Sequence, residues 1–207
     1  MARPIGFDPE QALERAMDVF WSRGYQAASI EELVARMGIQ RGSLYGTFGD
    51  KRALFLRAVD RYQRVVAREL FDALEAPGSG LAAIRRFFRL RVESALDRRR
   101  PPGCLVTNST VELSGRDRGA AAKVGGSLVR RPRSAARWSA PARPASSRAA
   151  GMCGRSRFLT SSAQGLSVMA KAFPERAILE DVVSVILSTL EPGRPRPRRR
   201  RAGNEAP

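Results

Sequence analysis

Apolar residues recur at the spacing of an amphipathic helix along most of the chain, and no stretch shows a convincing β-strand alternation. The segment FDPEQALERAMDVFWSRGY opens with Asp8 as a candidate N-cap, three residues before Gln11 in capping-box spacing, and closes with Gly24 as a candidate C-cap. The next segment, SIEELVARMG, repeats this plan with Ser29 as its N-cap and Gly38 at its end. The pattern predicts an all-α protein.

The same spacing predicts further helices in the rest of the chain, interrupted by breaks at APGSG and RRRPPG. A helix over CLVTNSTVELSG would bury one apolar face. These helices are expected over about residues 41–48, 50–74, 81–97, 104–115, 158–173 and 178–190.

The periodic pattern stops at Val129 and resumes at Phe158. Residues 130–157 contain no Leu, Ile, Val or Phe, and 25 of these 28 residues are Arg, Pro, Ser, Ala or Gly. Such a composition offers no apolar stripe, so we expect an irregular segment there rather than a core helix. Two explanations stay open: an authentic basic linker, or an out-of-frame segment between two compensating insertions or deletions. The Pro- and Arg-rich tail, residues 191–207, is expected to be disordered.

Charge points to an anionic partner, because 37 Lys and Arg face 20 Asp and Glu for a net charge of +17. Nucleic acid is the favoured partner over a membrane surface. The absence of histidine excludes Ser-His and Cys-His catalysis, and two cysteines cannot form a four-ligand zinc site. We therefore expect no enzyme, catalytic site, metal or cofactor. No apolar run approaches the length of a membrane span and no signal core opens the chain, so a cytoplasmic protein is expected.

The first fifty residues have the spacing of a helix-turn-helix, in which the third helix enters the major groove. In QRGSLYGTF, Arg41 can reach phosphate or guanine, Gly42 allows close backbone approach, and Tyr45 offers a phenol to phosphate. The alternative is a small helical hairpin with polar surface residues. The candidate DNA-binding residues are Ser29, Gln40, Arg41, Gly42, Ser43, Tyr45, Thr47 and Lys51.

The stretch ASIEELVARMGIQRGSLYGTFGDKRALF closely resembles the N-terminal domain of the TetR family of bacterial transcriptional regulators, over roughly residues 8–58. In that family Ser or Thr opens the second helix, a Gly–aliphatic pair forms the turn, and GxLYxxFxxK makes the recognition helix and the start of the fourth helix. One departure is Thr47, where many members carry an aromatic residue or His that touches phosphate. The matching residues here are Ser29, Gly38, Ile39, Gly42, Leu44, Tyr45, Phe48 and Lys51.

The resemblance implies a homodimer on a palindromic double-stranded DNA operator, and an all-helical C-terminal domain that binds an unknown small-molecule inducer. The inducer would favour a dimer conformation that no longer fits the operator, as expected of a repressor. We expect a DNA-binding domain over 8–54, an inducer-binding and dimerisation domain over 55–190, and the tail over 191–207. The last two helices usually form the dimer interface in this family. The alternative is a basic accessory protein that coats nucleic acid without sequence choice and has an impaired sensor domain.

Cys104 follows a helix break in PPGCLVTNS, and Lys171 lies on a later predicted helix. Some TetR-like regulators with a GCL segment at this point are similar to sensors of electrophiles or oxidants, in which a nearby cation lowers the thiol pKa. The alternative is a buried cysteine that acts as a small apolar residue, with Lys171 solvated. Phe87, Phe88 and Asn108 are candidates for an inducer cavity between helices, and plain core packing is their alternative.

Overall fold

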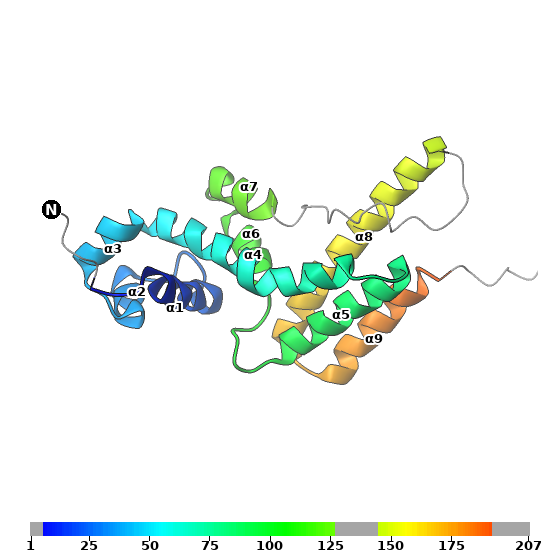
Figure 1. Ribbon diagram of the computed structural model, residues 1–207, viewed down its shortest axis with the longest axis horizontal. Helices are drawn as coiled ribbons and strands as arrows, with labels where there is room; N and C mark the ends of the chain where they lie inside the picture. Colours follow the sequence, from blue (N-terminus) through cyan, green and yellow to red (C-terminus); the bar gives the residue numbers. More distant parts are fainter. Residues whose placement is uncertain (1–5, 127–144, 192–207) are drawn as a thin grey trace, which may run out of the picture.

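The structure, a computed structural model, describes residues 6–126 and 145–191, with side chains in the second range described from Gly154 onward. Those residues form helices and contain no β-strand, which confirms the expected all-α fold class (Figure 1). None of the described helices is long and apolar enough to cross a membrane. The helices are α1 Pro9–Arg23, α2 Ile30–Met37, α3 Arg41–Phe48, α4 Lys51–Glu75, α5 Gly80–Leu96, α6 Leu105–Leu113, α7 Arg118–Gly126, α8 Ala145–Ala172 and α9 Arg176–Ser188.

The first helices begin and end at the residues that cap them. The Ser29 hydroxyl accepts a hydrogen bond from the Glu32 amide at 3.0 Å, and the Asp50 carboxylate accepts one from the Ala53 amide at 2.7 Å. Gly38 ends α2 in the left-handed region with φ +71°, which a side chain would disfavour. The expected capping box at Gln11 is absent, because its side-chain oxygen accepts from Arg15 instead.

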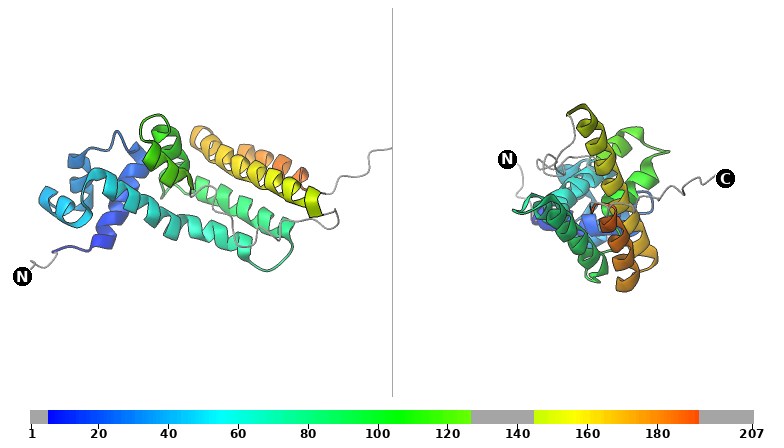
Figure 2. Two further views of the ribbon diagram at one scale, coloured as in Figure 1. Left: turned by 90° about the horizontal axis from the view of Figure 1, so that it is seen from above. Right: turned by 90° about the vertical axis from the view of Figure 1, so that its right-hand side faces the viewer.

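The described helices make an elongated molecule with α1–α3 at one end and α5, α8 and α9 at the other (Figures 1 and 2). Helix α4 runs from the first group into the second, and α6 and α7 lie beside its middle. Two hydrophobic clusters follow this division. The first cluster joins α1–α4 with α6 and α7, and the second joins α5, α8 and α9.

Aromatic side chains at the centre of the first cluster fix α1 against α4. The Phe20 ring meets Phe55 edge-on at a centroid distance of 5.2 Å, and Trp21 meets Tyr62 edge-on at 4.9 Å. Arg61 of α4 adds ion pairs to two carboxylates of α1. This packing gives the short helices α2 and α3 a rigid support.

The second cluster packs three helices whose apolar residues follow the expected stripes. Its fully buried members include Phe88 of α5, Leu166 of α8 and Leu179 of α9. The domain boundary predicted at residues 54–55 falls within α4, whose buried residues from Leu54 to Val66 belong to the first cluster. The structure therefore links the two expected domains through a continuous helix.

Two parts of the chain differ from the expected helices. Helix α7 was not predicted, because RGAAAKVGG is short and glycine-rich and buries only Ala120 and Val124. The expectation of an irregular segment over 130–157 was wrong for residues 145–157, which form the first half of α8. Residues 154–157 are not buried, in keeping with their lack of apolar side chains. Residues 127–144 lie outside the described residues, as does the tail predicted to be disordered over 191–207, except for Glu191.

Candidate functional site

Helix α3 is amphipathic: one apolar face packs on the core, and the opposite face is exposed to solvent. Leu44 is fully buried and Phe48 nearly so, which fixes the helix in rotation about its axis. On the outer side Arg41 is exposed and the Tyr45 side chain has 43% of its surface accessible. Gln40 precedes the helix as its N-cap residue and is also exposed. These candidate DNA-binding residues therefore lie together on one accessible surface.

Arg41 has a weak local partner in Glu31. Its guanidinium lies 3.2 Å from the Glu31 carboxylate, and the two side chains are 62% and 73% exposed. Exposed pairs of this kind contribute only about 0.2–1 kcal/mol. The Arg41 guanidinium carbon also lies 5.9 Å from the centre of the Tyr45 ring, so the two side chains form one patch.

Two glycines lie one turn apart on α3 and face open space. No atom lies within 4 Å of the point where a Cβ would stand at Gly42 or Gly46. A glycine inside a helix costs about 0.5–1 kcal/mol relative to alanine, and no contact within the described structure requires these two. Their absent side chains let the helix backbone approach an external surface closely. Gly46 was missed among the sequence candidates, although its i, i+4 spacing from Gly42 is a readable signal.

The other candidate DNA-binding residues have partners inside the protein. The Ser29 hydroxyl caps α2. Lys51 donates from Nζ to the Gln26 carbonyl at 3.2 Å and lies 4.9 Å from the centre of the Tyr25 ring. Burial lowers the Lys51 pKa, and the nearby Glu112 carboxylate opposes that shift. The structure thus places Lys51 against the turn between α1 and α2, residues 24–28.

The end of α3 is fixed by an arginine that the sequence candidates did not include. Arg57 of α4 donates to the Thr47 carbonyl at 3.1 Å, and its guanidinium carbon lies 5.7 Å from the centre of the Phe48 ring. Thr47 and Ser43 are both half-buried beside the more exposed Tyr45. DNA contacts by these two hydroxyls stay predictions.

Cys104 is a buried thiol at the N-cap of α6, with only 6% of its surface exposed. Tyr62 donates its phenol hydrogen to Sγ at 3.4 Å. Burial raises the pKa of the Cys104 thiol, but the positive charge of Arg91 and the hydrogen bond from Tyr62 outweigh burial, so the net pKa lies below its usual value. The surroundings of Cys104 therefore make this thiol easier to deprotonate than an unperturbed cysteine.

The cation near Cys104 is Arg91 of α5 rather than the expected Lys171, which is exposed on α8. Arg91 is fixed by hydrogen bonds to the Ala163 carbonyl and the Ser167 hydroxyl of α8. Arg91 is not evident as a partner from the sequence, because twelve residues and a helix break separate it from the cysteine. Only the packing of α4, α5 and α6 brings the two together.

The residues proposed for an inducer cavity lie on two helices, α5 and α6. Phe88 is buried in the second cluster, and Phe87 meets it edge-on at a centroid distance of 5.3 Å. Asn108 is half-buried on α6, next to Gly103. Lining an inducer cavity stays a prediction for all three residues.

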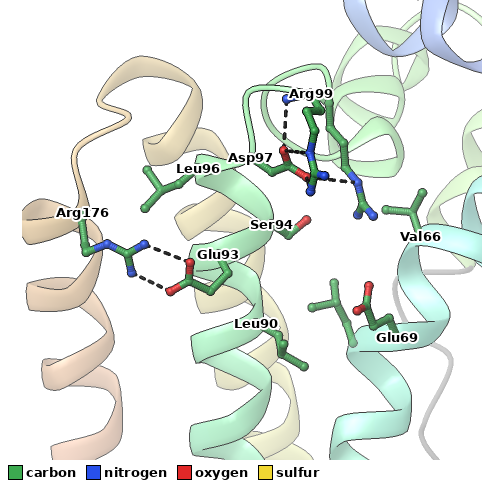
Figure 3. Close-up of a pocket in the computed structure, with 11 residues that line it drawn as sticks. Val66, Glu69, Leu90, Glu93, Ser94, Leu96, Asp97, Arg99 and Arg176 are labelled. Carbon is green, nitrogen blue, oxygen red and sulfur yellow. Dashed lines mark hydrogen bonds and ion pairs between the residues drawn. The ribbon is translucent and has the colours of Figure 1, made fainter.

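A groove of about 430 Å³ lies elsewhere, between α4, α5 and the start of α9 (Figure 3). Its wall combines apolar side chains such as Leu90 with charged ones, and Arg176 closes one side by donating to both carboxylate oxygens of Glu93 at 2.6 and 2.9 Å. None of the predicted sensor residues lines this groove. Within the described residues there is also no cluster of three side chains able to hold a metal ion.

Comparisons with known proteins agree with this arrangement. Residues 12–58 match the family described as bacterial regulatory proteins, tetR family. A solved cysteine mutant of the TetR family transcriptional regulator CifR, complexed with a 26-bp double-strand operator DNA, is 32% identical with a TM-score of 0.76. That similarity covers 90% of this chain and 98% of the CifR chain. This chain belongs to the TetR family.

This TetR-family protein is a DNA-binding transcriptional regulator and not an enzyme. It is 41% identical over 112 residues to the HTH-type transcriptional regulator YezE of Bacillus subtilis, covering 54% of this chain and 58% of YezE. It is 33% identical over 113 residues to the repressor ComR of Escherichia coli, covering 54% of each chain. The chain thus spans a little over half the length of these curated relatives.

Replacing Gly46 by alanine in this TetR-family regulator should stabilise the protein. Because the site is helical and open, we expect Gly46→Ala to raise the free energy of unfolding by about 0.5–1 kcal/mol, measured by urea denaturation. The matched control is Gly49→Ala, where φ is +83° and alanine should destabilise instead. A stability loss in Gly46→Ala would show that the glycine serves the fold and not an external contact.

Proposed function

We propose that this regulator is a repressor that binds a palindromic operator as a homodimer and leaves it when its C-terminal part responds to a chemical signal. The observation that carries the proposal is the outer surface of α3. There Arg41 and Tyr45 lie next to Gly42 and Gly46, which have no neighbouring atoms where a side chain would begin. Two such helices in a dimer can enter consecutive major grooves of a two-fold symmetric site.

Repression is supported by the relatives. ComR and BdcR of Escherichia coli are both named transcriptional repressors, and their similarity to this chain reaches 33% and 40% identity. The solved CifR chain was complexed with operator DNA. A repressor of this kind occludes its operator until the signal shifts the population of dimers.

Selecting bound fragments of genomic DNA with the purified protein tests operator recognition. We expect one palindromic sequence, and we expect Arg41→Gln to weaken binding to it about tenfold, as for the loss of a phosphate or base contact. Arg68→Gln is the matched control, because it removes an equally exposed positive charge from α4. Equal losses in the two variants would mean that charge alone governs binding. Gly46→Ala should also weaken operator binding despite its higher stability.

The second candidate function, sequence-independent binding of nucleic acid, rests on the basic segments of the sequence. Deleting residues 191–207 should lower non-specific affinity and its salt dependence but leave operator preference intact. If the full-length protein showed no operator preference, and the deletion weakened all DNA binding while Arg41→Gln had no effect, the non-specific function would replace the repressor.

Dimerisation is supported by apolar side chains that the single chain leaves exposed on its last helices. Phe158 and Val168 of α8 are 42% and 53% exposed, and Val185 of α9 is 66% exposed. Helices α8 and α9 lie side by side (Figure 2). Large apolar side chains left exposed on neighbouring helices are typical of a protein–protein interface.

A charge in this surface should separate the subunits. We expect Val185→Glu to be monomeric by analytical ultracentrifugation and to bind the full operator at least tenfold more weakly, because it loses the second half-site. The control, Val65→Glu, places the same charge at an exposed valine of α4 and should stay dimeric. A dimeric Val185→Glu protein would move the interface away from this part of α9.

Cys104 is proposed as the group that receives the signal, because Arg91 and the Tyr62 hydroxyl beside it lower the pKa of its thiol. Treatment of the operator complex with a quinone or with hypochlorite should release the wild-type protein, and Cys104→Ser should stay bound under the same conditions. The measurement is fluorescence anisotropy of a labelled operator. Release of the Cys104→Ser protein at the wild-type dose would remove Cys104 from the mechanism.

A further inference from the structure

Glu112, near the end of α6, contacts the turn between α1 and α2 across 86 residues of chain. Its two carboxylate oxygens accept hydrogen bonds from the backbone amides of Tyr25 at 2.9 Å and Gln26 at 2.7 Å. Such charge-assisted bonds are about twice as strong as neutral ones. They fix the chain segment that leads directly into α2 and the recognition helix.

Gly24 makes this close approach of Glu112 possible. A Cβ at residue 24 would stand 2.8 Å from a carboxylate oxygen of Glu112, and the backbone there has φ +88°. Both the missing side chain and the backbone conformation suit glycine alone. The contact therefore depends on one residue in each of the two expected domains.

A second pair of residues joins α4 to the segment between α6 and α7. Arg52, at the start of α4, lies 2.9 Å from the Asp117 carboxylate, just after α6. The other oxygen of Asp117 accepts from the Ala120 amide at 2.8 Å and so begins α7. The end of α6 is thus connected to both the α1–α2 turn and the first turn of α4.

The opposite end of α6 begins at the proposed signal-receiving group. Cys104 is the N-cap, and the next two residues, Leu105 and Val106, are at most 4% exposed. The cavity beside Gly103 measures about 10 Å³, room for no more than one water molecule. Atoms added at Cys104 must therefore displace α6, because a close-packed interior cannot absorb them.

Helix α6 has nine residues and is about 13 Å long, so its two ends move together. A displacement of about 1 Å, ordinary for helix shifts in switching proteins, would take the Glu112 oxygens out of hydrogen-bonding range of the two amides. The α1–α2 turn would then lose its only described contact with the carboxylate of another helix.

We propose that Glu112 is a positioning residue for operator binding, which orients the α2–α3 unit through the α1–α2 turn and transmits the position of α6 to it. This inference rests on the proposed function, in which DNA is bound at α3 and the signal is received at Cys104. The coupling is reciprocal, so operator binding must also stabilise this position of α6. Because reaction at the buried thiol of Cys104 requires α6 to move, operator binding should then slow that reaction.

The test measures the alkylation rate of Cys104 by iodoacetamide, with and without saturating operator, in a Cys153→Ser background that leaves one thiol. In the parent protein we expect operator to slow alkylation about tenfold, within the usual range of coupling between sites. In Glu112→Gln operator should slow it less than twofold. The matched control Glu69→Gln removes an exposed carboxylate of α4 and should retain the full tenfold effect.

Two further measurements separate coupling from simple stability. Urea denaturation reports whether Glu112→Gln is folded, and Glu112→Asp keeps the charge while shortening its reach, so it should also lose operator protection. If Glu112→Gln is less stable but keeps tenfold protection, Glu112 is only structural and the inference is overturned. If the parent protein binds operator without any slowing of alkylation, coupling is absent although the repressor function stands. Absence of operator binding in the parent protein would instead refute the proposed function itself.

Discussion

The continuous burial of α4 is the constraint on which the rest of the structure depends. From Leu54 to Leu74 this helix buries a residue about every turn, first against α1 and α6 and then towards α5. Because a helix is stiff over this length, the position of α3 at its start follows from the packing around its middle. Cys104 contacts the middle of α4 through Tyr62. Both the proposed DNA-binding helix α3 and the proposed sensing thiol therefore pack against the same rigid helix.

The sequence was most informative where local chemistry decides the structure. Asp8, Ser29 and Asp50 cap their helices, and Gly24 and Gly38 end them, so the predicted limits of α1–α4 agree with the structure within about a residue. Local patterns failed where tertiary contacts decide. Helix α7 shows little apolar periodicity of its own and forms against α4 and α6 with Asp117 at its start.

The proposed sites also differ in whether local sequence or tertiary contacts determine them. The outer face of α3 could be read from QRGSLYGTF, because an eight-residue helix with two core residues leaves its other side chains exposed. The partners of Cys104 could not, because Arg91 and Tyr62 come from two other helices and nothing in the sequence pairs them with the cysteine. Nothing in the sequence distinguishes Glu112 from the other acidic residues, of which the chain has twenty in all. Its role depends on the fold, which places the backbone amides of Tyr25 and Gln26 next to its carboxylate.

The contact between Gly24 and Glu112 limits how freely the DNA-binding and sensor domains of such regulators can be recombined. A recombinant regulator made by joining residues 1–54 to a foreign sensor would separate the carboxylate from the turn that it binds. Both amides of that turn would then need water or a new acceptor. The unit that would have to be transferred is therefore discontinuous in sequence. It comprises the N-terminal helices α1–α3 together with α6.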